Sequence, residues 1–412
     1  MSQLSPEAAF GAALGRVGVK RLGLAVSGGG DSMALMHLAA AWAAQSGAVL
    51  QVASVDHRLR PEAGGEVAMV ARAAHALGLD HAILTWEQAP GNGNLQDAAR
   101  RARYGLLADW ARAHALEAVA LGHTLDDQGE TFLMRLARGS GVDGLAAMRA
   151  DWHAHGMRWL RPLLGVGRQA LRDWLGARKI EWVEDPSNED ARFARVRARG
   201  ALEALAPLDI DAPRLAATAA RLARARAALS HYAFEAARAH CRTQSGDVLV
   251  ARAAFDLPDE TVGRLIAHAL CWVASAPYRP RYRALSGALA ALAQGRRASL
   301  HGCLLSPEAE SVRISREFQA VKQVESPPGA LWDQRWRLRG GERGVVIRAL
   351  GQKLDEVADW RQSGLPRASL MASPAVFRAA RLVAAPLAGL SAGWSAELDP
   401  INGDFHQTLL LH

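Results

Sequence analysis

The chain has 412 residues, a length that predicts two or three domains. Because 50% of its residues are hydrophobic and 22% are charged, its composition excludes an intrinsically disordered protein. Its net charge of +8 favours a polyanionic partner such as a nucleic acid. The charge does not require such a partner, because almost all of it is arginine, and arginine-rich usage can also reflect the nucleotide composition of a genome. The cysteines, Cys241, Cys271 and Cys303, form no CxxC pair; this argues against a disulfide framework, a zinc site or an iron–sulfur cluster and favours a reducing cytoplasm.

The sequence predicts no targeting or membrane segment. Residues 1–19 lack a basic segment followed by an apolar one, so we expect no signal peptide. The most apolar stretch, residues 33–50, carries His37, Gln45 and Ser46. We therefore expect a buried helix there, and no membrane span.

Strand and helix patterns alternate through the first 121 residues. The expected strands are Leu22–Ser27, Val49–Val55, His81–Trp86 and Leu116–Leu121. Helical stretches between them require right-handed crossovers, which predicts an α/β fold with a Rossmann-like parallel sheet and helices on both faces. Ligands bind beyond the carboxyl ends of such strands. The loops Ser27–Ser32, Asp56–Arg60 and Gly122–Asp127 are therefore expected to converge on one cleft.

The first of these loops, which we call the phosphate loop, has the composition of a phosphate site. Glycines let the backbone approach a pyrophosphate, and the N-terminus of the following helix adds partial positive charge. No Lys-Ser/Thr pair follows the glycines, so it is not a Walker loop. Its six residues are Ser27, Gly28, Gly29, Gly30, Asp31 and Ser32.

Residues 122–131 (GHTLDDQGET) follow the fourth expected strand and open a helix. Asp127 and Glu130, which we call the acidic pair, stand three residues apart and so share one helix face. Two carboxylates there suit a cationic substrate, Mg²⁺ or proton transfer from an amine. The alternative is that they only complement the helix dipole.

Two further segments are rich in arginine. Residues 94–104 begin a helix whose Arg100 and Arg103 suit a phosphate or a carboxylate, with a solvated basic face as the alternative. The turn-forming segment WVEDPSN at 182–188 precedes a run that suits a nucleic-acid backbone, with stacking from Phe193 or Trp182; ordinary surface arginine is the alternative. The arginines of this run are Arg192, Arg195, Arg197 and Arg199.

The pattern changes after residue 199. Helix is expected over 201–241, 259–274 and 281–294, then a linker at 322–329, and short strands in a mixed α/β module beyond it. We therefore expect a catalytic domain over residues 1–205, a helical domain over 206–321 and a small α/β C-terminal domain over 330–412.

Several motifs in order carry a family resemblance: SGGGDS, VDHRLRPEA, NLQDAARRARY, GHTLDDQGET, RGSGVDGLAAM, RPLL and WVEDPSN. The first resembles the loop of the PP-loop ATP pyrophosphatases. The set, over about the first 200 residues, resembles the tRNA(Ile)-lysidine synthetases, and the last part of the chain resembles their C-terminal domain more weakly. Three positions depart from the family pattern, with consequences for finer RNA and adenine contacts: Arg58, Gly129 and Val196.

The resemblance implies a cytoplasmic ligase that acts on a CAU-anticodon tRNA(Ile) with ATP, Mg²⁺ and L-lysine, with a homodimer left open. It implies that the phosphate loop holds ATP and that Asp31 organises Mg²⁺. It implies a lysine site formed by Arg103, Asp127 and Glu130, which with Asp31 make the catalytic set. The run from Arg192 to Arg199 is the implied tRNA contact, and the two later domains are implied to grip and select the tRNA.

Three other classes compete with this interpretation. A tRNA thiolase would need catalytic or cluster-binding cysteines, which the dispersed cysteines do not supply. A glutamine-dependent amidotransferase would need an ammonia-producing domain, and we expect none ahead of the loop because Ser2, not cysteine, follows Met1. A non-catalytic nucleotide- or RNA-binding module would not need Asp31 and the acidic pair, which are present.

Overall fold

The computed structural model describes residues 5–56, 63–86, 95–184, 192, 194–400 and 403–411. The chain forms two compact units, residues 1–226 and 227–412, and helix α9 (Ala212–His240) contains the boundary between them. The expected division into three domains stays a prediction.

The first unit is built on a six-stranded sheet of order β3-β2-β1-β4-β6-β5, in which β5 alone runs antiparallel to its neighbour. Its strands are β1 (Arg21–Ala25), β2 (Val49–Asp56), β3 (Asp80–Thr85), β4 (Ala118–Leu121), β5 (Asp151–Ala154) and β6 (Met157–Leu160). Its helices are α1 (Pro6–Gly15), α2 (Gly30–Ser46), α3 (Ala63–Ala76), α4 (Leu95–Ala113), α5 (Leu125–Leu136), α6 (Val142–Leu145), α7 (Arg168–Ala177) and α8 (Ala194–Leu205). The predicted parallel α/β sheet is confirmed.

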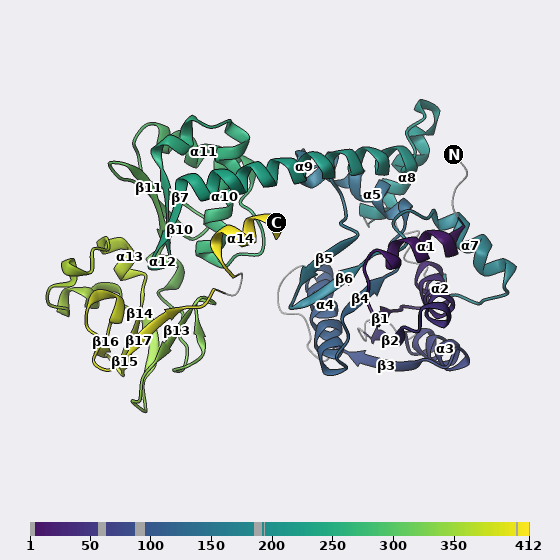
Figure 1. The fold of residues 1–412 in the computed structure, drawn as a ribbon, viewed down its shortest axis with the longest axis horizontal. Helices are drawn as coiled ribbons and strands as arrows, with labels where there is room; N and C mark the ends of the chain where they lie inside the picture. The colour runs from purple at the N-terminus through teal and green to yellow at the C-terminus, as the bar shows by residue number, and fades with distance from the viewer. Residues whose placement is uncertain are drawn as a thin grey trace. The chain divides into compact units, whose positions relative to one another are not determined.

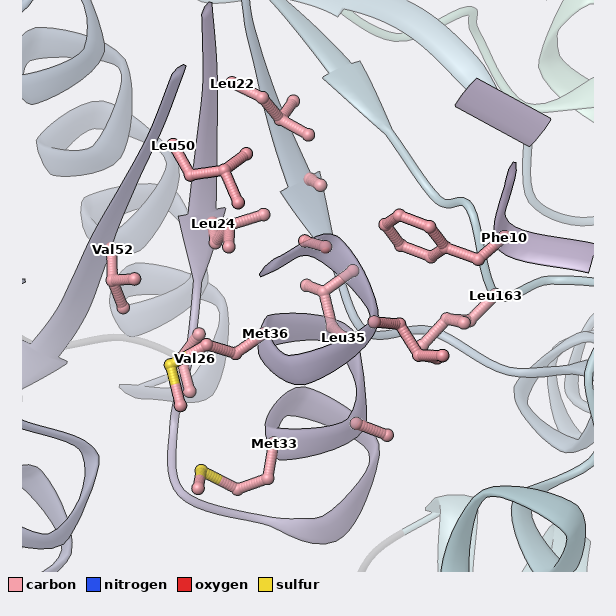
Figure 2. Close-up of a cluster of buried hydrophobic side chains, with 14 of the residues drawn as sticks. Phe10, Leu22, Leu24, Val26, Met33, Leu35, Met36, Leu50, Val52 and Leu163 are labelled. Carbon is pink, nitrogen blue, oxygen red and sulfur yellow. The ribbon is translucent and has the colours of Figure 1, made fainter. Parts of the chain in front are cut away.

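Alternation along the strands supplies an apolar surface to each face of this sheet. Leu22 and Leu24 of β1 belong to a core shared with α1, α2, α3 and α7, whereas Ala25 belongs to a second core under α4. The two cores lie on opposite faces, so the expectation of helices on both faces is confirmed (Figure 1). Figure 2 shows side chains of β1, β2 and α2 gathered in the first core.

A five-stranded antiparallel sheet of order β7-β8-β11-β10-β9 lies in the second unit. Its strands are β7 (Cys241–Gln244), β8 (Asp247–Ala251), β9 (Ala298–Leu300), β10 (Cys303–Pro307) and β11 (Ser311–Arg316). It packs with α10 (Asp259–Ala274) and α11 (Tyr282–Ala293), two helices that the sequence predicted closely. The sequence pattern did not predict this sheet, because its strands have only three to six residues and carry little continuous alternation.

The rest of the second unit contains two three-stranded sheets, of order β12-β13-β17 and β14-β15-β16, over two small cores. The strands are β12 (Leu331–Trp332), β13 (Trp336–Arg339), β14 (Val346–Ala349), β15 (Pro374–Arg378), β16 (Arg381–Ala384) and β17 (Ser395–Leu398). The helices are α12 (Phe318–Val321), α13 (Arg367–Met371) and α14 (Phe405–Leu411). Within the described part of the chain, every helix is too short or too polar to cross a bilayer.

Candidate active site

The phosphate loop is held from within by Ser32, in the first turn of α2. Ser32 Oγ donates a hydrogen bond to the Gly29 carbonyl at 2.9 Å and accepts one from the Ser27 backbone N–H at 3.1 Å. Gly28 has a φ of +92°, and a Cβ added there would meet Met69 Cε at 3.4 Å. A side chain at Gly28 would be strained by that backbone conformation, so the loop shape depends on glycine.

The WVEDPSN segment begins beside this loop. The Val183 N–H donates to the Gly28 carbonyl at 3.0 Å, and the Trp182 ring lies 3.4 Å from where a Gly30 Cβ would be. An aromatic ring therefore covers the backbone at the start of α2. Residues 185–188 of the segment lie outside the described residues, as do residues 57–60 of the loop after β2.

The end of β4 reaches the phosphate loop through backbone contact. A Cβ added at Gly122 would lie 2.9 Å from the Asp31 carbonyl oxygen, closer than real Cβ atoms come. Glycine at this position therefore lets the strand end lie against the first turn of α2.

Arg168, the first residue of α7, joins the phosphate loop to the acidic pair. Its Nε donates to Asp31 Oδ2 at 3.2 Å and its Nη1 to Glu130 Oε1 at 3.2 Å, while Nη2 lies 3.5 Å from Asp127 Oδ1. Its backbone N–H donates to Asp126 Oδ2 at 2.6 Å, which fixes the start of α7. Burial opposes its charge, but the carboxylates raise the pKa of Arg168 above its ordinary value. The expected convergence of these two strand-end loops is confirmed.

Asp127 has a local structural role as well as a place in this cluster. Its Oδ2 accepts from the Thr124 backbone N–H at 2.8 Å and from Thr124 Oγ1 at 3.0 Å, which forms a capping box at the start of α5. Burial acts to raise the pKa of Asp127, but the Arg195 charge, the Thr124 hydrogen bond and the Arg168 charge hold it below its usual range. The carboxylate is therefore kept ionised.

Glu130 is the more deeply buried member of the acidic pair, with 1% of its surface exposed. Its Oε1 accepts from Arg168 and from Arg199 Nη2, each at 3.2 Å. Its Oε2 is buried and has no hydrogen-bond partner among the residues that the structure describes. A buried carboxylate oxygen left without a donor is costly, so this atom is an open acceptor for a cation.

The arginines predicted to contact tRNA divide between two faces. Arg195 Nη1 lies 3.6 Å from Asp127 Oδ1, and Arg199 binds Glu130, because residues four apart share a face of α8. Arg192 and Arg197 are exposed, and Arg197 Nη1 donates to the Arg192 carbonyl at 2.8 Å. Phe193 lies outside the described residues.

Arg103, on α4, belongs to the same neighbourhood. Burial lowers the pKa of its guanidinium, and Arg100 and Arg195 act on it as like charges in the same direction. A partly buried cation that is repelled by neighbouring cations is stabilised by an anion such as a carboxylate.

His123 and Arg161 support the loop after β4. Arg161 Nε donates to His123 Nδ1 at 3.1 Å, and its guanidinium lies 3.8 Å from the centroid of the Trp152 ring. Burial first, and then the Arg161 charge, lower the pKa of His123 to about 3. The imidazole is therefore neutral at physiological pH and can accept this hydrogen bond.

Asp31 is suited to a magnesium site in which phosphate oxygens supply most of the ligands. Its side chain is 25% exposed, and burial raises its pKa to about 6, which Arg168 partly opposes. The described residues contain no group of three or more His, Cys, Asp or Glu side chains arranged for a metal. Mg²⁺ bound with nucleotide commonly takes one or two carboxylates plus phosphate oxygens, so a lone aspartate beside the phosphate loop suits it.

Sequence reasoning missed Arg168, Asp126 and the supporting role of His123. Arg168 stands 38 residues beyond Glu130 and begins a short helix, and only its place after the RPLL turn and Gly167 distinguishes it. A glycine followed by a basic residue at a helix start is too common a pattern to have indicated the contact.

One departure from the family pattern has a packing explanation. A Cβ added at Gly129 would lie 3.0 Å from both Ala212 Cα and Ala212 Cβ, so glycine admits a close approach of α9. Val196 lies within α8, and Arg58 is outside the described residues.

Comparisons with known proteins identify the family of this chain. Residues 4–205 match the family model of the PP-loop domain. A tRNA(Ile)-lysidine synthase of Ruegeria pomeroyi is 52% identical over 95% of this chain and 94% of its own length, and one of Wolbachia pipientis is 35% identical over 82% of each. Among solved structures, a U34-tRNA thiolase of Methanococcus maripaludis has a TM-score of 0.47 and 15% identity over 53% of this chain and 77% of that chain. On the strength of the Ruegeria match, which covers nearly the whole of both chains, this chain belongs to the tRNA(Ile)-lysidine synthase family.

Proposed function

We propose that this chain joins the ε-amine of lysine to C2 of the wobble cytidine in a CAU-anticodon tRNA(Ile), converting ATP to AMP and pyrophosphate. Family membership supports an ATP-using ligase that modifies tRNA(Ile). The observation that carries the rest is that one guanidinium, that of Arg168, binds both Asp31 of the phosphate loop and Glu130 of the acidic pair. A nucleotide and an amine would therefore meet in one cavity.

The reaction balances in two steps. Cytosine O2 attacks the α-phosphorus of ATP, and the bond to pyrophosphate breaks. The lysine ε-nitrogen, after its ammonium loses a proton, then attacks C2, and the C2–O2 bond breaks as AMP leaves with that oxygen. The cytosine must leave its stack to reach the cavity.

In the first step the phosphate loop would hold the triphosphate through its backbone and the α2 N-terminus. Asp31 is the side chain that would bind Mg²⁺, and the ion would neutralise charge on the departing pyrophosphate. Arg168 sets the position of Asp31 and lowers the pKa of that carboxyl, so it favours the ionised form.

In the second step the acidic pair would bind the lysine ammonium. Glu130 Oε2, which has no hydrogen-bond partner in the described part of the chain, is the acceptor that an ammonium donor would satisfy, and the carboxylates offer oxygens to receive its proton. Arg103 would bind the α-carboxylate of lysine, since a guanidinium forms bidentate pairs with carboxylates. These roles are those that the family resemblance implies for Arg103, Asp127 and Glu130.

For the tRNA we propose a division within the predicted arginine run. Arg192 and Arg197, on the exposed side, would contact phosphates, whereas Arg195 and Arg199 are engaged with the acidic pair. The homodimer and the tRNA-gripping roles of residues 206–321 and 330–412 stay predictions.

A thiolase is the competing enzyme class, and the cysteines favour the ligase. All three are free and buried, and burial raises the pKa of Cys241 and Cys303 to about 12 and that of Cys271 to about 11. A thiol with so high a pKa is a poor nucleophile and a poor cluster ligand.

The test is a product assay by mass spectrometry. The full chain is incubated with ATP, Mg²⁺, lysine and a CAU-anticodon tRNA(Ile) transcript. The tRNA is then digested to nucleosides, and their masses are measured. We expect cytidine to gain the mass of one lysine less one water, only when every substrate is present. ATP consumption that leaves every nucleoside mass unchanged would overturn the proposal.

The variant Asp127→Asn separates the two steps. Asparagine keeps an acceptor for Thr124 at the cap but removes the charge beside the ammonium. We expect tRNA-dependent ATP–pyrophosphate exchange to stay largely intact while kcat/KM for lysine falls at least about tenfold. Loss of exchange with lysine binding retained would remove Asp127 from the lysine site.

A further inference from the structure

Two tyrosines in the second unit are exposed to an unusual degree. Tyr278, in the loop after α10, has 75% of its surface exposed, and Tyr282, the first residue of α11, has 84% exposed. The chain has only four tyrosines, and these two stand within five residues of one another. Leaving large rings in water forfeits the stabilisation that burial would give, so a paired exposure of this kind indicates a binding surface.

The charged residues next to these tyrosines in the sequence are all basic. Arg279, Arg281 and Arg283 alternate with the tyrosines and proline in the sequence YRPRYR. Between Glu260 and Glu308 the sequence contains no Asp or Glu. Within that interval it contains Arg264, Arg279, Arg281, Arg283, Arg296 and Arg297. Positive charge with no acidic residue in the same stretch is complementary to a polyanion.

The fold presents these side chains on an ordered segment. The loop is fixed where the Ala276 N–H donates to the Cys271 carbonyl at 2.9 Å and Cys271 Sγ donates to the Tyr278 carbonyl at 3.3 Å. The buried residues of α11 are Leu285, Ala288 and Leu292, which define its inner face. Tyr282 and its neighbour Arg283 are both exposed at the start of the same helix.

We propose that Tyr278, Arg279, Arg281, Tyr282 and Arg283, here called the tyrosine–arginine surface, bind unpaired bases of the tRNA substrate. The tyrosine rings stack on the faces of splayed bases, and the guanidinium groups bind the adjoining phosphates. This inference rests on the proposed function, since it takes the tRNA of that reaction as the ligand.

Unpaired RNA is the occupant that this combination of side chains favours. Every base offers a π-face, and stacking on an aromatic side chain combines with arginine–phosphate contacts in single-strand recognition. A duplex hides its base faces, so duplex binding would use the arginines and leave the tyrosines without a role.

The test measures tRNA affinity of the full chain by fluorescence anisotropy. Each of Tyr278→Ala and Tyr282→Ala is expected to raise Kd for tRNA at least about fivefold, and the double variant about 25-fold, from the usual cost of removing a stacked ring. Tyr278→Phe and Tyr282→Phe keep the rings and should bind as the wild type does. Tyr232→Ala, at a tyrosine on α9 with 46% exposure, is the matched control and should leave Kd unchanged.

A second pair of measurements separates stacking from charge. The tyrosine variants should not weaken binding to a fully paired RNA of the same length, whereas Arg281→Gln with Arg283→Gln should weaken both and reduce the salt slope by about 0.7 for each phosphate that is no longer bound. Equal weakening on duplex and tRNA in the tyrosine variants, or no weakening on either, would overturn the inference. The second result would leave a protein partner as the alternative occupant.

Failure of this inference and failure of the proposed function give different results. If the wild-type chain forms lysidine and the alanine variants bind tRNA normally, only the tyrosine–arginine surface is rejected. If the wild-type chain binds tRNA but forms no lysidine, the proposed reaction is rejected, and the affinity comparison still decides whether this surface binds RNA.

Discussion

Glu130 and Asp247 are two buried carboxylates whose surroundings differ in one respect. Asp247, on β8, accepts through Oδ2 from Ser369 Oγ at 2.6 Å and from Arg313 Nη1 at 3.1 Å, and Arg313 is as deeply buried as its partner. Glu130 also accepts from arginine, through Oε1, but its Oε2 has no donor within the residues described by the structure. The carboxylate of Asp247 joins β8, β11 and α13 and is not among the described buried groups that lack a partner, whereas Oε2 of Glu130 is one of them and is the proposed acceptor for a cation.

This difference separates a structural ion pair from the proposed binding site in this chain. Burial alone does not separate the two, since 5% of Asp247 and 1% of Glu130 is exposed. The two carboxylates differ instead in whether a buried oxygen lacks a hydrogen-bond donor among the described residues.

The largest expected effect is on stability, from Asp247→Ala. Removing the carboxylate leaves two buried donors, Ser369 Oγ and Arg313 Nη1, without this acceptor, which costs about 3 kcal/mol in all even though Arg313 keeps Glu308 and Gln244 as partners. Hydrogen exchange of peptides that cover β8 and β11 should accelerate accordingly, with KM for lysine unchanged. Exchange as slow as in the wild type would mean that this pair does not stabilise the second unit.

Glu130→Gln should have the opposite pattern, with little effect on stability and a large effect on the use of lysine. Arg168 keeps Asp31 and Asp127 as partners, and Arg199 is 36% exposed and can turn toward water, so the unfolding free energy should change by less than about 1 kcal/mol. The charge available to an ammonium is lost, and kcat/KM for lysine should fall about 100-fold. Steady-state kinetics beside urea unfolding measure both, and Arg172→Gln, at an exposed ion pair on α7, is the control expected to alter neither.

His123 should make stability depend on pH. Its pKa is about 3 in the folded chain and near 6.5 when unfolded, so its contribution is complete above pH 6.5 and declines as pH falls toward 3. Between pH 7 and pH 5 the wild type should lose about 2 kcal/mol from this group. His123→Asn retains an acceptor for Arg161 but does not titrate, so its urea unfolding should lack that loss. Equal pH dependence of the two proteins would contradict the neutral, buried imidazole.

The smallest expected effect concerns the two faces of the predicted arginine run. Arg197→Gln should reduce the salt slope of tRNA binding by about 0.7 to 0.9, the effect of one bound phosphate. Arg195→Gln, beside Asp127, should instead change KM for lysine with little effect on that slope. Binding isotherms at several salt concentrations measure the slopes. An unchanged slope in both variants would remove the run from the tRNA interface.

The sequence by itself determined the parallel sheet, the phosphate loop and the start of α5, because these depend on local patterns. Apolar runs form strands, glycines permit the loop, and Thr124 with Asp127 caps a helix through contacts three residues apart. Only the tertiary structure decided that Arg168 joins Asp31, which is 137 residues away in the chain, to the acidic pair. It also decided that Arg195 and Arg199 contact carboxylates and that strands within residues 241–316 form a sheet. Such contacts arise when distant segments pack together, and the residue types near each position carry no record of that packing.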